Sequence, residues 1–474
     1  MWYDNLNEKR MWEIFEEISR VPRESGNEEG IRNFLLSWAE KNGFRADRDG
    51  IGNVFIYADA TEGYENVPPL ALQGHMDMVC VKRDGSSHDF TKDPIEIEYD
   101  GKFIKAKDTT LGADNGIAIA MTLALISDPE SQHGPIEGIF TISEETGLTG
   151  AFNIDPEKVK AKRMINLDSE EEGIIYIGCA GGVDLDSKIT FKREENPYSN
   201  GYKIEVSGLL GGHSGGEIDK ERGNAIKILA RALKNIGKFS LAEISGGTKR
   251  NVIPSYAYAV ISTDSRIEKK IAKVEKQVQN ELKNADPGIR ITITPVENPQ
   301  YIIPGKKKKK IIDALFTAPH GVKTMSTTIK GIVETSNNLA IVSTQEDSLC
   351  VVNSIRSNIA SSKENHLDTL KTLYSSFGFK NTESDGYPEW EPDPASPFLK
   401  EVDKLYKEIM GRKAKVTAIH AGLECGIINK RIKGMDSISI GPDLFDVHSV
   451  NEHIIAESAE RVYDFLKEMV RRLG

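Results

Sequence analysis

The first part of the chain, up to about residue 180, alternates between helical and strand-like hydrophobic patterns, and this alternation restricts the fold more than any other feature. Helical periodicity covers residues 11–19 and 28–42, and the apolar stretch at 116–126 indicates a buried helix. Short apolar segments that indicate buried strands lie at 69–73, 136–142 and 163–167. Because strands that alternate with helices form layered folds, we predict an α/β domain with a mixed, mostly parallel sheet flanked by helices.

The pattern changes after about residue 182, where apolar and polar side chains alternate along the predicted strands. This alternation is typical of an antiparallel sheet with one exposed face. The strands are predicted at 184–192, 202–206, 257–264 and 288–294. Amphipathic helices are predicted at 224–236 and 268–284. We therefore predict an α+β domain in this part of the chain.

An acidic, proline-rich segment at 387–397 indicates an extended connection between domains, and the first type of pattern returns after it. We therefore predict that residues 1–185 and 397–474 form one α/β domain, which is interrupted by an inserted α+β domain at 186–396. A unit of strand, polar turn and long charged helix recurs within the insertion, at 255–284 and 348–377. This recurrence suggests an internal duplication of the inserted domain.

The composition argues against several classes of function. The chain has 474 residues, 28% of them charged, and a net charge of −11, whereas a nucleic-acid surface needs clustered Lys and Arg. The lysine run at 306–310 is isolated, and we interpret it as the solvated start of a charged helix. No apolar stretch reaches the ~18 residues of a membrane span. We therefore expect neither a nucleic-acid partner nor a membrane partner.

The N-terminal sequence and the cysteines indicate the compartment. The sequence MWYDNLNEKRMWEIF lacks the basic start and apolar run of a signal peptide. Cys80, Cys179, Cys350 and Cys425 are scattered and form no CxxC pair, so we interpret them as buried or surface thiols. A reducing cytoplasm is the simplest location for such a protein.

Acidic and imidazole side chains stand at the ends of predicted strands or in glycine-containing loops. The set comprises His75, Asp114, Glu145, Asp168 and His448. In open α/β sheets, functional sites form outside the carboxyl ends of the strands, so residues far apart in the sequence are expected to meet there. Imidazole and carboxylate together suit zinc, with manganese and cobalt as competitors.

These five residues can be divided between two cations. Two cations ~3.5–4 Å apart need a bridging ligand, and we assign that role to Asp114, which lies in a tight glycine-containing loop. His75 and Asp168 would complete one cation site, and Glu145 and His448 would complete the other. The sequence therefore predicts two divalent metal ions, with zinc as the first candidate.

Two further residues beside these ligands have expected catalytic roles. Glu144 can take a proton from the attacking water and pass it to the leaving amine. Asp77 would hydrogen-bond to His75 and fix its tautomer. His453 is an alternative to His448 as the last ligand, and we prefer His448 because it is closer to the turn at residues 441–442.

Seven motifs carry a resemblance to a known family: GHMDMV (74–79), DTTLGADNGIA (108–118), SEETGLTGA (143–151), NLDSEEEG (166–173), GLLGGHSGGEID (208–219), KRNVIP (249–254) and HAGLECG (420–426). Over nearly its whole length, the chain resembles the co-catalytic zinc aminopeptidase and carboxypeptidase family. That family includes carnosinases, carboxypeptidase G, aminoacylases and succinyl-diaminopimelate desuccinylases. The 108–118 and 420–426 motifs favour its bacterial aminoacyl-histidine dipeptidase branch, also called Xaa-His or cytosol non-specific dipeptidases.

The resemblance implies the same five metal ligands, the same roles for Asp77 and Glu144, and a lid function for the inserted domain. His213 matches the lid histidine that steadies the tetrahedral oxyanion. Asn251 and Arg356 match clamps for the C-terminal carboxylate of the substrate, and Glu424 is expected to receive its α-amine. Members of this family often dimerise through the lid, so the resemblance makes a homodimer one option and leaves the oligomeric state open, with His213 acting within or across subunits.

The resulting expectation is a metal-dependent dipeptidase for unblocked dipeptides, including Xaa-His and carnosine-like substrates. The alternative is an N-acyl amino acid deacylase that uses the same paired-metal site. Such an enzyme needs no amine receptor, so Glu424 argues against it. A third reading, a binding protein with an inactive site, is disfavoured because all five ligands and Glu144 are present.

Overall fold

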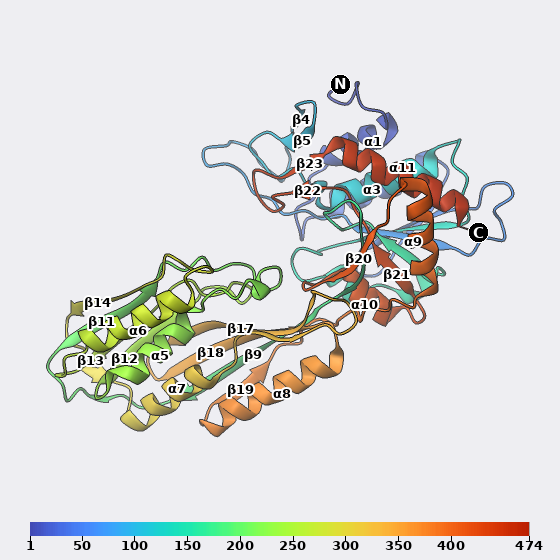
Figure 1. The fold of residues 1–474 in the computed structure, drawn as a ribbon. Coiled ribbons are helices and arrows are strands. Elements are labelled where there is room, and N and C mark those ends of the chain that lie inside the picture. Colours follow the sequence, from blue (N-terminus) through green and yellow to red (C-terminus); the bar gives the residue numbers. More distant parts are fainter. Residues whose placement is uncertain (474) are drawn as a thin grey trace. The chain divides into compact units, whose positions relative to one another are not determined.

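The computed structural model describes residues 1–473, and the chain divides into two units. The first unit contains Met1–Cys179, Pro392–Ala418 and the chain from Leu423 onward. The second unit contains Ala180–Glu391 and the short segment Ile419–Gly422. Figure 1 shows the helices and strands of both units in sequence colours, and each unit is described by itself below.

An eight-stranded sheet forms the centre of the first unit. In order across the sheet, its strands are β1 (Arg45–Arg48), β2 (Val54–Ala58), β6 (Ile136–Thr141), β3 (Leu70–His75), β7 (Arg163–Asn166), β21 (Asp436–Ser439), β8 (Ile174–Cys179) and β20 (Lys415–Ile419). The central strands β6, β3, β7 and β21 run parallel to one another. Every residue of β3 and β6 is buried, as expected for parallel strands covered on both faces.

Helices pack around this sheet. They are α1 (Lys9–Ser19), α2 (Glu29–Lys41), α3 (Ala113–Ser127), α4 (Thr149–Phe152), α9 (Pro397–Met410), α10 (Glu424–Arg431) and α11 (Ala456–Arg472), with a 3₁₀ helix at Pro156–Lys158. The apolar helix α3 is buried along almost its whole length and contacts α1 and α11 (Figure 1). A burial of this extent explains why its sequence is apolar on every side rather than amphipathic.

A small antiparallel sheet combines two strands that precede α3 in the chain with two strands from the C-terminal part. Its strands, in order, are β22 (Leu444–Phe445), β23 (His453–Ile455), β5 (Phe103–Ala106) and β4 (Ile97–Tyr99). These strands have two to four residues each, and a period-2 pattern cannot be recognised over so short a length. The sequence therefore gave no prediction of this sheet.

A nine-stranded sheet forms the second unit. Eight strands follow the order β14 (Arg290–Val296), β11 (Gly201–Ser207), β13 (Ala257–Ser262), β12 (Ser240–Gly246), β17 (Val333–Thr344), β18 (Ser348–Ser357), β9 (Gly181–Thr190) and β19 (Lys380–Glu383). The ninth strand, β16 (Gly321–Met325), pairs with β17, and β10 (Glu194–Glu195) pairs with β15 (Tyr301–Ile302) apart from this sheet. The strand pairings described here for this unit are antiparallel, as the alternating pattern predicts.

Helices α5 (Ala225–Ile236), α6 (Glu268–Glu281), α7 (Gly305–Thr317) and α8 (Ala360–Ser376) share one apolar cluster with the strands of this sheet. Alternate strand residues, such as Ile204 and Val206 of β11, point into that cluster. The lysine run 306–310 begins helix α7, as expected. A short 3₁₀ helix at Ile218–Lys220 follows the His213 loop.

The nine-stranded sheet has two halves with matching topology. Strands β11, β12, β13 and β14 with α5 and α6 follow the order β-α-β-β-α-β, and β9, β17, β18 and β19 with α7 and α8 follow the same order. Strands β12 and β17 join the halves through two residue pairs, Ser245–Ser343 and Gly246–Val342. The internal duplication remains a proposal, and this repeated order supports it.

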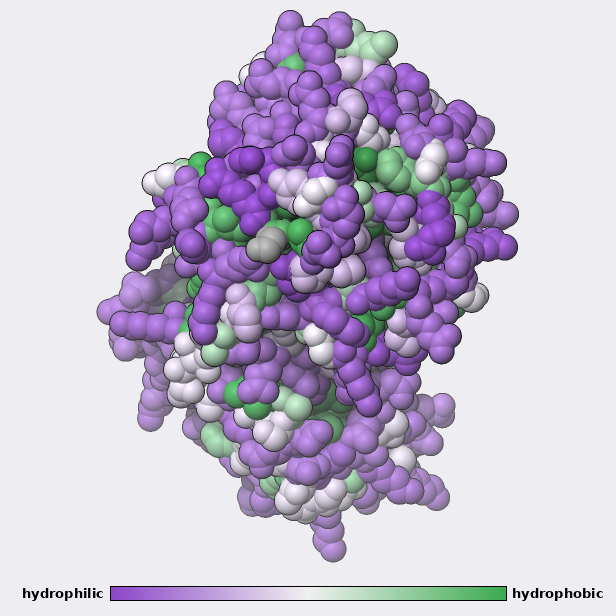
Figure 2. Space-filling view, turned by 90° about the vertical axis from the view of Figure 1, so that its right-hand side faces the viewer, coloured by the Kyte–Doolittle hydropathy of each residue, from purple (hydrophilic) through white to green (hydrophobic). Residues whose placement is uncertain are grey.

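None of the helices within residues 1–473 combines the length and the apolar character needed to cross a membrane. The face drawn in Figure 2 is mostly hydrophilic, with hydrophobic residues in small scattered patches.

Candidate active site

The first ligand group gathers at the carboxyl ends of the parallel strands. His75 is the last residue of β3 and lies opposite Thr141 of β6, while Asp168 follows the neighbouring strand β7. His75 Nε2 lies 3.0 Å from Asp114 Oδ1 and 3.5 Å from Asp168 Oδ1. The parallel register therefore brings together residues that are 93 positions apart in the chain.

The second group shares Asp114 with the first. Asp114 lies at the start of helix α3, one residue after its first residue, and its second oxygen, Oδ2, lies 3.1 Å from His448 Nε2. That nitrogen also lies 2.9 Å from Glu145 Oε1. Each carboxylate oxygen of Asp114 thus faces a different histidine, which is the arrangement that a bridging ligand needs.

These donors fit two divalent cations. His75, Asp114 and Asp168 form one set of ligand atoms within 4.8 Å of one another, and Asp114, Glu145 and His448 form another. Each set combines imidazole with carboxylate, which suits zinc and its neighbours among the transition metals. His453 belongs to neither set, because its Nδ1 lies 2.8 Å from the carbonyl oxygen of Asn451.

The electrostatics of the cluster also favour bound cations. Burial raises the pKa of Glu144 to about 8, and the carboxylates of Glu424, Glu145 and Asp114 act in the same direction against the influence of His75. Hydrogen bonds with Asp114 and Glu145 raise the pKa of His448 to about 11. A dense group of carboxylates retains protons in this way unless a stronger positive charge is present, and divalent cations supply that charge.

Asp77 is completely buried and connects the ligand His75 to the loop that carries Glu144 and Glu145. One of its oxygens lies 3.4 Å from His75 Nδ1 and accepts from the Glu144 N–H at 3.0 Å. The other accepts from the Ser25 hydroxyl at 2.7 Å and from the Glu145 N–H at 3.3 Å. Although burial raises the pKa of Asp77, the hydrogen bond with His75 holds it below its usual value, so the carboxylate stays charged.

Glu144 is close to the predicted metal ligands, although its predicted role is proton transfer. Its carboxylate lies with His75 and Glu145 in a set of atoms within 4.8 Å of one another. The preceding residue, Ser143, has a positive φ of 48°, and its N–H and hydroxyl both donate to the carboxylate of Glu28. The tight turn after β6 therefore fixes where Glu144 points.

Glu424 contacts the strands β3 and β6 and is completely buried. Its Oε2 accepts from Gln73 Nε2 at 2.5 Å and from Thr141 Oγ1 at 2.6 Å. Its Oε1 has no hydrogen-bond partner among residues 1–473. Burial raises the pKa of Glu424 to about 7, against the hydrogen bond from Thr141.

The second unit carries His213, which lies in an exposed loop before the 3₁₀ helix. Its ring atom Nδ1 accepts from the Gly216 N–H at 3.2 Å. The backbone N–H of His213 donates to the carboxylate of Glu217. Partial desolvation by neighbouring atoms lowers the pKa of His213, and nearby Arg356 adds to this effect. A neutral ring whose Nδ1 accepts a hydrogen bond carries its proton on Nε2, so Nε2 is a donor.

Asn251 and Arg356 line one pocket of about 200 Å³ within the second unit. The pocket also contains Arg250, Ser354 and Tyr387. Arg356 is 8% exposed and donates from Nη1 to the Tyr387 hydroxyl at 2.7 Å. In the part of the chain that the structure describes, no carboxylate pairs with Arg356 and its Nε finds no partner. A buried guanidinium of this kind suits an external carboxylate.

Several residues of the first unit that support the ligands were not predicted from the sequence. Glu28 and Ser25 hold the loop after β6, and Arg23 and Glu452 contact the loop before Asp114. Each is a single charged or hydroxyl residue in a loop. Such a residue has no periodicity or spacing that distinguishes it from a surface residue.

Comparison with known proteins identifies the family. Residues 204–290 match the family model of the M20 peptidase dimerisation domain. The chain is 37% identical to the cytosol non-specific dipeptidase of Escherichia coli, over 99% of this chain and 98% of that protein. The chain belongs to the M20 peptidase family. The resemblance seen in its motifs is therefore confirmed.

Solved structures agree with this assignment. The aminoacylhistidine dipeptidase of Vibrio alginolyticus is 35% identical to this M20 peptidase and matches it with a TM-score of 0.90, covering 99% of this chain and 97% of that one. Human carnosine dipeptidase 1 is 12% identical and has a TM-score of 0.52, covering 99% and 98% of the two chains, which shows a shared fold. The predicted α/β fold with an α+β insertion is confirmed.

Proposed function

We propose that this M20 peptidase is a metal-dependent dipeptidase that hydrolyses the peptide bond of unblocked dipeptides. The observation that carries the proposal is the position of Asp114, whose two carboxylate oxygens lie 3.0 and 3.1 Å from two different histidines. The names of its full-length relatives, a non-specific dipeptidase and an aminoacylhistidine dipeptidase, support the substrate class. Xaa-His and carnosine-like dipeptides are the specific candidates.

Five residues form the proposed metal site: His75, Asp114, Glu145, Asp168 and His448. Two divalent cations held there would polarise the scissile carbonyl and lower the pKa of water. We propose zinc as the resident metal, because its preferred nitrogen and oxygen ligands match this set.

The residues of the chain move the protons. Glu144 takes a proton from the attacking water and delivers it to the departing amine, which needs a carboxylate within hydrogen-bond reach of both. Asp77 keeps the proton of His75 on Nδ1, so that Nε2 presents its lone pair to a cation. Because Asp77 also accepts from the N–H groups of Glu144 and Glu145, it positions the base and a ligand together.

The second unit is proposed as the lid, with His213 as the donor to the oxyanion. The hydrogen bond from Gly216 to Nδ1 supports this role, since it leaves the ring proton on Nε2. A preorganised donor aimed at a developing negative charge contributes strongly to catalysis. Substrate binding and release would then depend on lid motion.

Asn251 and Arg356 are proposed to hold the C-terminal carboxylate of the substrate. Their shared pocket supports this role, as does the buried guanidinium, which has no carboxylate partner among residues 1–473. Glu424 as the receptor of the α-amine stays a prediction. Its complete burial means that an amine would have to displace the side chains that cover it.

The relatives support proposals on location and assembly. We propose a cytoplasmic location, because the Escherichia coli relative is named as a cytosol enzyme. We also propose a homodimer, because residues 204–290 match a dimerisation domain. The acidic net charge of −11 gives no support for a nucleic-acid partner.

A panel of small substrates tests the proposed function. The panel contains Ala-His, β-Ala-His and Gly-Leu, the tripeptide Leu-Gly-Gly, an amidated dipeptide and N-acetyl amino acids. The protein is first stripped of metal, and zinc, manganese or cobalt is then added back. We expect cleavage of the dipeptides, a raised KM for the amidated one because Arg356 loses its partner, and no cleavage of the acetylated compounds. Cleavage of the acetylated compounds alone would instead establish the deacylase.

A further inference from the structure

Glu452 is a buried carboxylate that binds the backbone of the loop carrying Asp114. The residue is 2% exposed, and its Oε2 accepts from the N–H groups of Leu111 at 2.8 Å and Gly112 at 3.0 Å. Its Oε1 lies 3.3 Å from the N–H of Asp114 itself. Three donors of one loop thus converge on one side chain, and hydrogen bonds to a charged acceptor are stronger than neutral ones.

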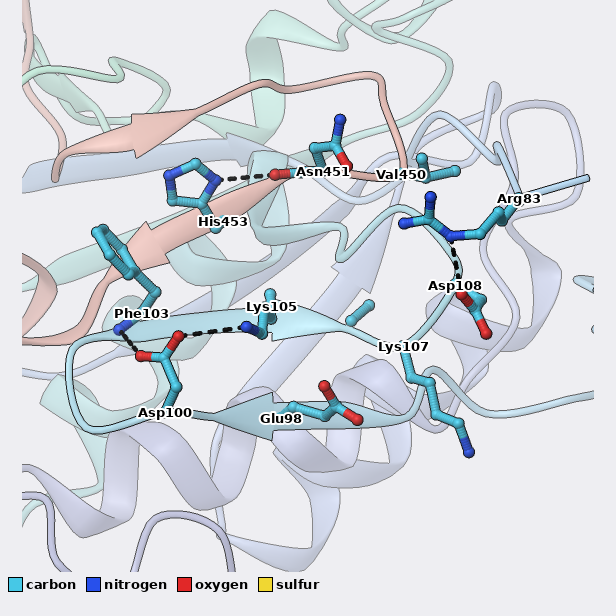
Figure 3. A pocket seen from close by; sticks show the side chains of 11 residues that line it. Arg83, Glu98, Asp100, Phe103, Lys105, Lys107, Asp108, Val450, Asn451 and His453 are labelled. Carbon is cyan, nitrogen blue, oxygen red and sulfur yellow. Dashed lines mark hydrogen bonds and ion pairs between the residues drawn. The ribbon is translucent and has the colours of Figure 1, made fainter.

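The position of Glu452 is set by its own segment. The strand β23 begins one residue later and pairs with β5, His453 opposite Lys105 and Ile454 opposite Ile104. Figure 3 shows this segment running beside β5, and Asn451 and His453 both line the pocket drawn there. The same segment contains His448, so Glu452 links the loop of one ligand to the loop of another.

Arg23 binds the same loop at a carbonyl oxygen, whereas Glu452 binds its N–H groups. It is 1% exposed, and its Nη1 donates to the carbonyl oxygens of Asp77 at 3.0 Å and Met76 at 3.3 Å. Its Nη2 donates to the carbonyl oxygen of Gly112. The guanidinium thereby ties the end of strand β3, where His75 lies, to the Asp114 loop.

Gly112 lies at the centre of these contacts, between the buried apolar residues Leu111 and Ala113. Gly112 has a φ of +70°, and a Cβ there would lie 2.7 Å from the Met78 sulfur as well as against Arg23. Because Gly112 bonds to Glu452 through its N–H and to Arg23 through its carbonyl, the two charged side chains fix the peptides on both sides of it.

We propose that Arg23 and Glu452 are positioning residues that set how Asp114 bridges the two cations. Both contact backbone atoms of the Asp114 loop and would act through that loop. The proposal rests on the paired-metal site proposed above. Residues that orient metal ligands in this way typically change metal affinity by 10–100-fold when they are replaced.

The test uses Glu452→Gln, which keeps the size of the side chain but puts an amide donor where one carboxylate oxygen accepts. Glu137→Gln is the matched control. Glu137 is 5% exposed and likewise accepts from two backbone N–H groups, those of Lys160 at 3.0 Å and Ala161 at 3.1 Å, in a loop away from the ligands. Asn451→Ala, at an exposed neighbour of Glu452, controls for disturbance of the segment.

Two readouts are needed, both on full-length protein stripped of metal. Titration with Mn²⁺ gives the affinity and the number of ions bound, and electron paramagnetic resonance distinguishes an exchange-coupled Mn²⁺ pair from isolated ions. We expect Glu452→Gln to bind the pair 10–100-fold more weakly and to lose the coupled signal, while Glu137→Gln keeps both even if its melting temperature falls. Asn451→Ala should behave as wild type.

Equal affinity and an unchanged coupled signal in Glu452→Gln would overturn the inference. If wild-type protein itself fails to bind two ions, the proposed function fails instead, so the two failures can be told apart. Should Glu452→Gln not fold, Arg23→Lys gives the same test. Lysine keeps the charge but has one nitrogen, which cannot reproduce the contacts that Arg23 makes through two.

Discussion

Replacing Glu144 with alanine is expected to lower kcat by 10²- to 10⁴-fold while the protein keeps both cations. The reason is that Glu144 is assigned to proton transfer and not to metal binding, although it lies within 4.8 Å of the ligand atoms of His75 and Glu145. Without its carboxylate, water has no base, and the departing amine has no proton donor. Turnover of Ala-His and the metal content of the same preparation, measured by mass spectrometry, check this expectation.

Glu145 provides the matched control for Glu144, because the two residues are neighbours in one loop. Glu145→Ala should remove a ligand from the second cation, whose other donor, His448 Nε2, lies 2.9 Å from it. We therefore expect Glu145→Ala to bind that cation more weakly, and Glu144→Ala to bind both as wild type does. Loss of metal from Glu144→Ala would show that the roles of the two glutamates are wrongly assigned.

Asp114→Asn is expected to have the largest effect on metal binding. An amide has one acceptor oxygen, and its nitrogen cannot bind a cation, so the variant can no longer serve both sites. We expect at most one tightly bound ion per chain. The loss of several kcal/mol of transition-state stabilisation should lower kcat/KM by roughly 10³-fold. Metal stoichiometry and dipeptide hydrolysis, each measured over a range of Zn²⁺ concentrations, provide the test.

Asp108→Asn is the control for this change, because Asp108 lies in the same motif but is 48% exposed and pairs with Arg83 at 2.9 Å. That surface ion pair should contribute little, and the variant should keep two ions and its activity. Two tightly bound ions in Asp114→Asn would contradict the bridging role.

The sequence predicted the parts of the site that depend on strand ends. Strands β3, β6 and β7 are short apolar runs, and a parallel sheet places the residues after them at one edge. His75, Glu144 and Asp168 could therefore be grouped without any structure. Helix α3 was equally recognisable, because its apolar run is too long for a strand.

Other parts could not be predicted, for physical reasons that differ from case to case. Strand β17 carries the polar run Ser336, Asn337 and Asn338, which is buried because its side chains bond to neighbouring segments, and this interrupts the apolar pattern. Arg23 and Glu452 act through backbone atoms of distant loops. No local pattern encodes such contacts, because any loop amide or carbonyl can serve as the partner.

The most direct test of the account is a metal titration of stripped wild-type protein, with Ala-His hydrolysis followed as Zn²⁺ is added. The account predicts no turnover without metal, and full turnover only when two equivalents per chain are bound, because Asp114 joins both ligand sets. Full activity in the stripped protein, or a plateau at one equivalent, would contradict the paired-metal mechanism.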